Sequence, residues 1–464
     1  MNENNIKDEQ ALLQSLENMY FLGIGGIGMS ALARYFHSKG KKVSGFDRTK
    51  TALTTVLEEN GIAIHYEENI SLIPDNISLV VYTPAIPAEN EELKYLVQKN
   101  VPMAKRSDVL GWITKPGFSI CVAGTHGKTT ISTMIAHILT NSGLGCNAFL
   151  GGIAVNYGTN FWSSDSNYCV VEADEYDRSF LKLSPDIAVI SAMDADHLDI
   201  YGKAENLENA FIDFSRKIEN NGCLFSKYGL KRSKELTASF HFQYSLNNEA
   251  ADIFATAIRI ENGVYHYTVC GKGWTIPDVQ LSMGGLHNIE NSVAAIAVAK
   301  YLKIDDEKIK KAVGTFRGVR RRFEFILKDD DHILIDDYAH HPEELRALIT
   351  GAKGLFPDKI CRVIFQPHLY SRTRDFAVEF AASLDLADEV ILLPVYPARE
   401  KPIEGVSSKL ILDQMQLKNK RLMEKQDLLN WIKNEDPEFL IMSGAGDIDR
   451  LIMETKDILI SNRR

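Results

Sequence analysis

The stretch VAGTHGKTT, residues 122–130, decides how the middle of this chain folds. It ends in the Gly-Lys-Thr of a phosphate-binding loop, whose usual pattern is G-x-x-x-x-G-K-[ST]. The first glycine of that pattern would fall on Val122, but the glycine here is Gly124, only three residues before Gly127. The apolar strand FSICVA precedes this short loop, and a helical pattern that stops at Gly143 follows it. That order of strand, loop and helix is the one a phosphate-binding loop requires.

The residue types in the loop suit phosphate chemistry. Backbone N–H groups of Gly124 and Gly127 would bind phosphate oxygens, and Lys128 would bind a terminal phosphate. The Thr129 hydroxyl would bind Mg²⁺. The alternative is a glycine turn followed by a solvated lysine, and the flanking strand and helix favour the phosphate-binding interpretation.

Acidic residues end the two strands that follow the loop. Glu172 ends the first strand, and the run DADHLD, residues 194–199, with His197 inside it, ends the second. Parallel strands bring their carboxyl ends to one edge of a sheet, so Glu172 and His197 are expected near the Mg²⁺ that Thr129 contacts. Without the loop, such an acidic run would more often be capping and surface chemistry.

A second glycine-rich turn, GIGGIG, occupies residues 23–28. Gly23, Gly25 and Gly28 fit G-x-G-x-x-G between a strand and a helix, and Asp47 ends the next strand. This pattern predicts a phosphate at the helix N-terminus and a carboxylate near a ribose hydroxyl. Three interpretations stay open: a dinucleotide such as NAD, a UDP-sugar, or a tight turn without a ligand.

Length and periodicity predict three α/β domains. A chain of 464 residues is too long for one core. Strands alternate with helical stretches, which predicts parallel sheets with crossover helices, and this pattern restarts twice. The restarts give domains 1–106, 107–323 and 324–464. Between residues 240 and 285 the alternation of polar and apolar residues instead suits antiparallel strands.

Composition excludes several classes of protein. Hydrophobic residues make up 45% and charged residues 25% of the chain, and no apolar run is long enough to cross a membrane. The polar start lacks the features of a secretory signal, and the six cysteines form no C-x-x-C pair, so we expect a reducing cytoplasm. The net charge of −10 argues against nucleic acid as the main partner.

The last third of the chain offers cationic and imidazole groups. His340 and His341 are adjacent, so they would point to opposite faces of a strand and are disfavoured as a metal pair, while Pro342 predicts the start of a helix. The arginines at 320–322 are either a solvated turn or groups that neutralise phosphates on domain closure. Arg372 follows a strand, where it suits a substrate carboxylate, with surface pairing as the alternative.

Blocks in chain order resemble the Mur ligase family and cover the chain nearly end to end. They are FLGIGGIGMSALA, VAGTHGKTT, VVEADEYD, DADHLDIYG, GGLHNIENSVAA, RRFE, IDDYAHHPEE, FQPHLYSRTRDF and SGAGDID. The short loop GTHGKT is that family's own form of the phosphate loop. The resemblance implies an N-terminal Rossmann-like domain, a central P-loop ATPase-like domain with a mainly parallel sheet plus a small antiparallel sheet, and a C-terminal Rossmann-like domain.

The resemblance also implies an activity. It is an ATP-dependent ligation of L-alanine to the carboxylate of UDP-N-acetylmuramate through an acyl phosphate, the first amino acid addition in peptidoglycan precursor synthesis. ATP and two Mg²⁺ ions would serve a cytoplasmic monomer or homodimer. One alternative is the attachment of the recycled tripeptide L-alanyl-gamma-D-glutamyl-meso-diaminopimelate to the same UDP-sugar. A non-catalytic nucleotide-binding regulator is another, against which the intact Lys128 and Thr129 argue.

The matched blocks imply the site residues. Lys128, Glu172 and His197 would be catalytic, and Thr129, Glu172 and His197 would bind metal. The implied ATP contacts are Gly124, Thr125, His126, Gly127, Lys128, Thr129, Thr130, His287, Asn288, Asn291, Arg322 and Asp337. Those to the UDP-sugar are Gly25, Gly26, Gly28 and Asp47, and those to the amino acid are Tyr338 and Arg372.

Three departures from the family pattern bear on specificity. Leu369 stands where arginine is common, which removes one expected contact to the alanine carboxylate. Tyr176 follows the EADE block where Ser-Asp is frequent, a feature shared with the tripeptide-recycling ligase. No lysine occurs between Lys203 and Lys217, where sister ligases carry a carbamylated lysine, and this disfavours the ligases for D-glutamate and diaminopimelate.

Overall fold

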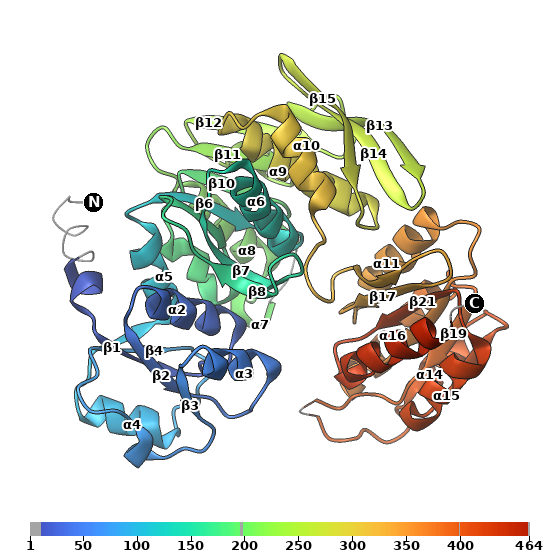
Figure 1. Ribbon diagram of the computed structural model, residues 1–464, viewed down its shortest axis with the longest axis horizontal. Helices are drawn as coiled ribbons and strands as arrows, with labels where there is room; N and C mark the ends of the chain where they lie inside the picture. The colour runs from blue at the N-terminus through green and yellow to red at the C-terminus, as the bar shows by residue number, and fades with distance from the viewer. Residues whose placement is uncertain (1–10, 195–197, 399, 463–464) are drawn as a thin grey trace. The chain divides into compact units, whose positions relative to one another are not determined.

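Two compact units make up the chain in the computed structural model, which describes residues 11–194, 198–398 and 400–462. The first unit consists of residues 1–256, 269–277 and 290–313. The second consists of residues 257–268, 278–289 and 314–464. Figure 1 shows helices alternating with strands along both units, which confirms the predicted α/β class.

A five-stranded parallel sheet opens the first unit, with strand order β3-β2-β1-β4-β5. The predicted strand before GIGGIG is β1, whose last four residues are buried. The strands are β1 (Asn18–Leu22), β2 (Lys42–Phe46), β3 (Ala63–His65), β4 (Leu79–Tyr82) and β5 (Met103–Lys105). The helices are α2 (Ile27–Ser38), α3 (Ala52–Glu59), α4 (Glu91–Gln98) and α5 (Arg106–Thr114).

A larger sheet follows in the same unit, and its middle strands run in the order β11-β10-β6-β9-β7. These pairs are parallel, and β8 is added antiparallel to β7. The strands are β6 (Phe118–Ala123), β7 (Asn147–Ala154), β8 (Thr159–Trp162), β9 (Tyr168–Glu172), β10 (Ile187–Ile190) and β11 (Cys223–Lys227). The helices are α6 (Lys128–Ser142), α7 (Leu198–Tyr201), α8 (Ala204–Ser215), α9 (Leu286–Tyr301) and α10 (Asp306–Thr315). The start of α9 and the end of α10 group with the second unit.

The region predicted to be antiparallel begins differently from the prediction. Its first strand, β12 (Phe240–Ser245), pairs in parallel with β11 and with the start of β13 (Ile253–Glu261). The hairpin pattern starts only after β13. A two-residue turn, Asn262 and Gly263, both with positive φ, leads into β14 (Val264–Gly271), and Lys272 and Gly273 lead into β15 (Trp274–Leu281). Two-residue turns with positive φ are typical of antiparallel hairpins.

The second unit carries a six-stranded sheet in the order β16-β17-β21-β18-β19-β20. Only the pairing of β16 with β17 is antiparallel. The strands are β16 (Glu324–Lys328), β17 (Ile333–Asp337), β18 (Arg362–Phe365), β19 (Glu389–Leu392), β20 (Lys420–Leu422) and β21 (Phe439–Ser443). The helices are α11 (Pro342–Leu355), α12 (Tyr370–Asp375), α13 (Ala377–Leu384), α14 (Ser408–Gln414), α15 (Lys425–Glu435) and α16 (Ile452–Ser461). Pro342 begins α11 as predicted.

The first two sheets share one hydrophobic core. Buried residues of the first sheet and of α2, such as Phe21 and Phe36, belong to the same cluster as Phe149 and Phe161 of the central sheet. Helix α2 contacts β7, β8 and α5, and Figure 1 shows it between the two sheets. The glycine turn before α2 and the phosphate loop before α6 therefore belong to one compact unit with a common core. Each sheet lies within one predicted domain, while the boundaries at 106 and 323 stay a prediction.

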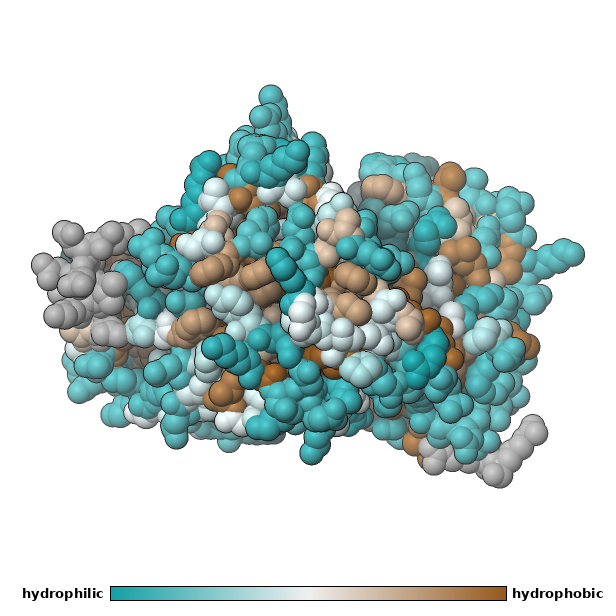
Figure 2. All heavy atoms as spheres, turned by 90° about the horizontal axis from the view of Figure 1, so that it is seen from above, coloured by the Kyte–Doolittle hydropathy of each residue, from teal (hydrophilic) through white to brown (hydrophobic). Residues whose placement is uncertain are grey.

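Surface and cysteine properties agree with the composition. Hydrophilic residues cover most of the face drawn in Figure 2. Among the described residues, no helix is both long enough and apolar enough to cross a membrane. All six cysteines are free thiols, and five of them are buried.

Candidate active site

The phosphate loop lies between β6 and α6, and its geometry requires two glycines. Gly124 has φ +136° and Gly127 has φ +82°, a backbone region that favours glycine. A Cβ atom on Gly124 would lie 2.3 Å from Ser191 Oγ, and one on Gly127 would lie 2.7 Å from Asn291 Oδ1. The loop is therefore packed against the end of β10 and against α9, and it leaves the first amides of α6 in position for an anion.

Lys128, the first residue of α6, is held by the loop and by a buried carboxylate. Its Nζ donates to Gly124 O at 2.8 Å and to Glu175 Oε1 at 2.8 Å, and Glu175 Oε2 also lies 2.8 Å away. The Glu175 side chain is fully buried and that of Lys128 is 15% exposed. Burial raises the pKa of the Glu175 carboxyl, and the Lys128 ammonium opposes that shift. Lys128 is therefore held at the start of α6 by an ion pair with a buried carboxylate.

Thr129 and Glu172 meet as the sequence predicted. Thr129 Oγ1 donates to Glu172 Oε1 at 2.9 Å, and Gly151 N donates to Glu172 Oε2 at 2.8 Å. The hydroxyl and carboxylate oxygens are hard ligands that suit Mg²⁺, which keeps several waters and takes few protein ligands. Among the described residues no group of three or more His, Cys, Asp and Glu side chains could hold a metal ion. His197 lies outside the described residues.

A second contact fixes the outer part of the loop. Asp194 N donates to Thr125 Oγ1 at 3.2 Å, and Thr125 N donates to Ala192 O at 3.3 Å. The Ser191 hydroxyl donates to His126 O and to Ala123 O. The His126 ring stays exposed, with Nε2 3.8 Å from Asp194 Oδ2. Thr130 is buried in the first turn of α6.

The first glycine turn is organised by Asp47. Gly25 N donates to Asp47 Oδ2 at 2.8 Å, and a Cβ atom on Gly25 would lie 2.8 Å from the same oxygen. The amide of Gly26 also has an acceptor within the turn, because Gly26 N donates to Gly23 O at 3.2 Å. The amides with no intrahelical acceptor are those of the first turn of α2, which begins at Ile27. Of the predicted glycines, Gly28 lies in that turn.

Two polar contacts tie α2 to the central sheet. Asn160, fully buried on β8, donates from Nδ2 to Ile27 O and, at 3.2 Å, to Ser30 Oγ. Arg34 Nη1 donates to Thr159 Oγ1 at 3.1 Å. These bonds join helix α2 to the sheet that carries Glu172.

Of the three residues predicted at the adenine, only Asn291 belongs to the first unit. Its Oδ1 faces Gly127, as noted above. His287 and Asn288 lie in the segment that groups with the second unit. Asn288 is buried and donates from Nδ2 to Gly284 O at 2.7 Å, whereas His287 is exposed. The structure therefore places Asn291 at the phosphate loop, and the adenine contacts of His287 and Asn288 stay a prediction.

In the second unit, Asp337 fastens the segment that precedes β16. Its Oδ2 accepts from Phe323 N at 2.6 Å and its Oδ1 accepts from Ala339 N at 2.7 Å. Burial raises the pKa of the Asp337 carboxyl to about 6, and these two backbone bonds and Arg322 oppose the shift. Arg322 itself is exposed. Both predicted nucleotide contacts therefore lie close together in this unit.

The neighbouring carboxyl, Asp336, was not predicted from the sequence. It is buried, Arg321 Nε lies 3.7 Å from its Oδ2, and burial raises its pKa to about 7. The Arg321 guanidinium also lies 5.0 Å over the ring of Tyr338, which is 45% exposed. The exposed ring of Tyr338 therefore lies against Arg321 and directly follows Asp336 and Asp337 in the chain.

Arg372 lies on α12, directly after the turn that contains Leu369. Arg372 Nη1 is buried and has no hydrogen-bond partner among the described residues. Leu369 has φ +70° and donates its N–H to Tyr396 O at 2.9 Å. The His368 ring stacks on Tyr396 and lies 6.1 Å from the ring of His340. An unpaired guanidinium beside aromatic rings is suited to a small carboxylate ligand.

Sequence reasoning missed two groups next to the predicted residues. Glu175 stands three positions after Glu172, and the missed signal was that a buried P-loop lysine needs a counter-charge. Arg106 begins α5, and the Cβ atom of a residue replacing Gly28 would lie 2.8 Å from its Nη1. Nothing local in the sequence signals that contact, because it depends on the packing of α5 on α2.

Models of three domains match the chain almost throughout. "Mur ligase family, catalytic domain" matches residues 18–117, "Mur ligase middle domain" matches 122–299 and "Mur ligase, glutamate ligase domain" matches 321–442. Among curated relatives, the UDP-N-acetylmuramate--L-alanine ligase of Parabacteroides distasonis is 50% identical over 96% of this chain and 98% of its own length. That of Flavobacterium johnsoniae is 47% identical over 97% of this chain and 99% of its own length.

Solved structures agree with these matches. The crystal structure of UDP-N-acetylmuramate-alanine ligase MurC from Thermotoga maritima superposes with a TM-score of 0.82 at 29% identity, covering 96% of this chain and 100% of that one. A murein peptide ligase from Psychrobacter arcticus gives a TM-score of 0.65 at 22% identity over 97% and 99% of the two chains, a likeness of fold alone. The chain belongs to the Mur ligase family.

Proposed function

We propose that this enzyme joins L-alanine to the carboxylate of UDP-N-acetylmuramate with consumption of ATP, the first amino acid addition in peptidoglycan precursor synthesis. The observation that carries the proposal is the placement of Lys128 beside the Thr129–Glu172 pair at the start of α6. Relatives up to 50% identical over nearly the whole chain are UDP-N-acetylmuramate--L-alanine ligases by name, which supports the substrate assignment.

The reaction takes two steps, a phosphoryl transfer and an acyl transfer. A carboxylate oxygen of the muramyl group attacks the γ-phosphorus of ATP, the bond to the bridging oxygen breaks, and an acyl phosphate and ADP form. The amine of L-alanine then attacks the acyl carbon, phosphate leaves with that carboxylate oxygen, and the amine loses a proton. The protein contributes charge neutralisation and positioning, which dominate catalysis of phosphoryl transfer.

In the first step, we assign the phosphates of ATP to the amides of the loop and of α6. The predicted contacts at Gly124, Thr125, His126, Gly127 and Thr130 belong to this cradle. The Lys128 ammonium has three N–H donors, so it would bind the γ-phosphate while it stays paired with Glu175. The buried carboxylate then keeps its counter-charge.

Mg²⁺ fits the oxygens of Thr129 and Glu172 described above. Bound there, it would neutralise charge on the transferring phosphoryl group. We propose His197 as the ligand of a second Mg²⁺, as the family resemblance implies. Asn291, with His287 and Asn288, is assigned to the adenine.

The UDP-sugar is assigned to the first sheet. Because Asp47 occupies the amide of Gly25, we place the diphosphate on the first turn of α2, which includes Gly28, with Gly26 beside it. Asp47 keeps its assignment near the uridine. Its Oδ1 already accepts from Thr49 N at 3.1 Å and has a second lone pair that can accept from a hydroxyl.

The second unit is assigned to the incoming amino acid and to part of ATP. The buried, unpaired Nη1 of Arg372 supports a role in binding the carboxylate of L-alanine, with Tyr338 at the same site. Arg322 and Asp337 are assigned to the phosphate and ribose of ATP. We place the enzyme in the cytoplasm, where ATP is available, as a monomer or homodimer that binds neither nucleic acid nor membrane.

The acceptor assignment is tested by ADP release. The enzyme is supplied with UDP-N-acetylmuramate, ATP and Mg²⁺, and L-alanine is compared with glycine, L-serine, D-glutamate and the recycled tripeptide. We expect L-alanine to give the highest kcat/KM. A preference for the tripeptide would move the enzyme to peptide recycling, and no ADP release with any acceptor would make it a nucleotide-binding regulator.

A further inference from the structure

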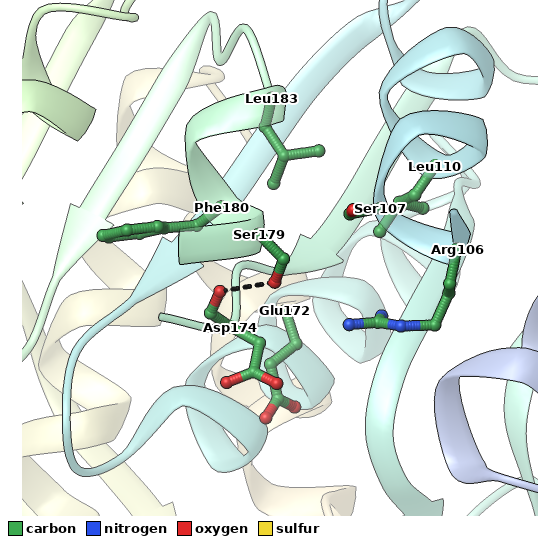
Figure 3. A pocket seen from close by; sticks show the side chains of 8 residues that line it. All are labelled: Arg106, Ser107, Leu110, Glu172, Asp174, Ser179, Phe180 and Leu183. Carbon is green, nitrogen blue, oxygen red and sulfur yellow. Dashed lines mark hydrogen bonds between the residues drawn. The ribbon is translucent and has the colours of Figure 1, made fainter. Parts of the chain in front are cut away.

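A small, solvent-open pocket in the first unit lies between the start of α5 and the segment that begins at the end of β9. One wall is the start of α5, with Arg106 and Ser107, and the opposite wall carries Glu172, Asp174 and Ser179. Figure 3 shows the Arg106 side chain extending across the cavity on the side of Glu172 and Asp174, with the Ser179 hydroxyl bonded to Asp174 O. Both walls belong to the first unit.

Arg106 is a cation without a partner in this cavity. Its side chain is half-buried, and it makes no hydrogen bond or ion pair with any side chain or backbone group that the structure describes. Half-buried arginines in folded proteins are normally paired, because a guanidinium carries five N–H donors. The acidic groups across the cavity are beyond ion-pair distance from it. The group is therefore available to an anionic ligand.

The position of Arg106 indicates which part of a ligand it reaches. Its guanidinium lies against Gly28, so that a Cβ there would be 2.8 Å from Nη1 and 3.3 Å from Cζ. Gly28 is in the first turn of α2, where helix geometry leaves amides without acceptors. A diphosphate whose first phosphate binds those amides can therefore bring its second phosphate to the guanidinium. Arg106 lines the same pocket as Glu172, which contacts Thr129.

We propose that Arg106 binds the sugar-linked phosphate of UDP-N-acetylmuramate and thereby directs the muramyl group across the cavity toward Thr129 and Glu172. This inference rests on the proposed function. In it, the uridine-linked phosphate is held by the glycine turn, and the guanidinium adds a paired hydrogen bond to the next phosphate. The carboxylate end of the sugar then points to the site where the γ-phosphate of ATP is held. Arg106 is a substrate-binding residue that acts before the chemical step.

The test is binding of four ligands to the full-length enzyme and its Arg106→Gln variant by calorimetry. The ligands are UMP, UDP, UDP-N-acetylglucosamine and UDP-N-acetylmuramate, which add the second phosphate, the sugar and the lactyl carboxylate in turn. We expect the three diphosphates to bind about 10- to 100-fold more weakly to Arg106→Gln, the usual effect of losing a charge-assisted hydrogen bond, and UMP to bind equally to both. Arg106→Lys should fall between them, because it keeps the charge without the paired geometry.

Lys105→Gln is the matched control. Lys105 is exposed, precedes Arg106 directly and carries the same charge, so its loss tests any general electrostatic effect. The control should bind all four ligands as the unaltered enzyme does. Kinetics supply a second measurement: Arg106→Gln should raise KM for UDP-N-acetylmuramate and leave KM for ATP unchanged.

Each other outcome overturns the inference. Weaker binding of UDP-N-acetylmuramate alone would assign Arg106 to the lactyl carboxylate, and weaker binding of UMP as well would mean that the glycine turn is disturbed. Equal binding of all four ligands to both proteins would remove Arg106 from the site. If the unaltered enzyme failed to bind UDP-N-acetylmuramate at all, the proposed function itself would fall, which is a different result.

Discussion

Replacing Lys128 with Met should remove ADP release and also destabilise the first unit. We expect the loss of stability because the Lys128 ammonium contacts both carboxylate oxygens of the fully buried Glu175 at 2.8 Å. Loss of the cation leaves that carboxylate buried and unpaired, a change that typically costs about 3–5 kcal/mol. For a unit of this size the midpoint of thermal unfolding should fall by about 5–15 °C.

The double variant Lys128→Met, Glu175→Gln tells the two effects apart. It removes both charges and keeps the shape of the Glu175 side chain, so we expect it to recover most of the lost stability. It should nevertheless release no ADP, because no cation is left to meet the γ-phosphate. Thermal unfolding and ADP release are measured on the unaltered enzyme, both single variants and the double variant.

Two results would refute this reasoning. One is a Lys128→Met variant that unfolds at the same temperature as the unaltered enzyme, which would mean that the ion pair contributes nothing. The other is a double variant that turns over, which would place the phosphate-binding cation elsewhere. UDP-N-acetylmuramate should still bind to every variant, because its assigned site is on α2.

Three further predictions concern other positions. Gly124→Ala should weaken ATP binding by at least about tenfold in calorimetry and leave UDP-sugar binding intact, since its Cβ would lie 2.3 Å from Ser191 Oγ; unchanged ATP affinity would contradict the loop geometry. Asp336, whose pKa burial raises to about 7, keeps its proton in the folded state while the unfolded chain loses it near pH 4, so the free energy of unfolding of the second unit should fall by about 2–4 kcal/mol between pH 4 and pH 7. Asp336→Asn should flatten that slope in urea titrations at each pH, and an equally steep slope would assign it to other groups. Leu369→Arg should lower the KM for L-alanine or leave it unchanged in initial-rate kinetics, and a large increase would show that this half-buried side chain packs against something essential.

Local patterns predicted the parts of the site that lie next to each other in sequence. The glycines and Lys128 follow directly from strand, loop and helix, and Thr129 meets Glu172 because parallel strands bring their ends to one edge. Pro342 begins α11 as its fixed φ favours. The rule that alternating polar and apolar residues indicate an antiparallel strand failed for β12. That strand alternates in this way but pairs in parallel with β11.

Residues that depend on packing between elements could not be predicted in this way. Asp47 occupies the amide of Gly25, which the motif had assigned to a phosphate, because the two meet only when β2 lies beside β1. Glu175 and Arg106 act through contacts that no short pattern contains. Charge balance would have found Glu175, since a buried lysine requires a nearby anion.

The central claim is that this enzyme activates the muramyl carboxylate with ATP and transfers it to L-alanine. The most direct test is turnover of UDP-N-acetylmuramate labelled with ¹⁸O in that carboxylate, in the presence of L-alanine, ATP and Mg²⁺. An acyl phosphate intermediate predicts that each phosphate released carries one ¹⁸O atom from the carboxylate and that an amide of L-alanine forms in equal amount. Release of unlabelled phosphate, or labelled phosphate without the L-alanine amide, would contradict the account.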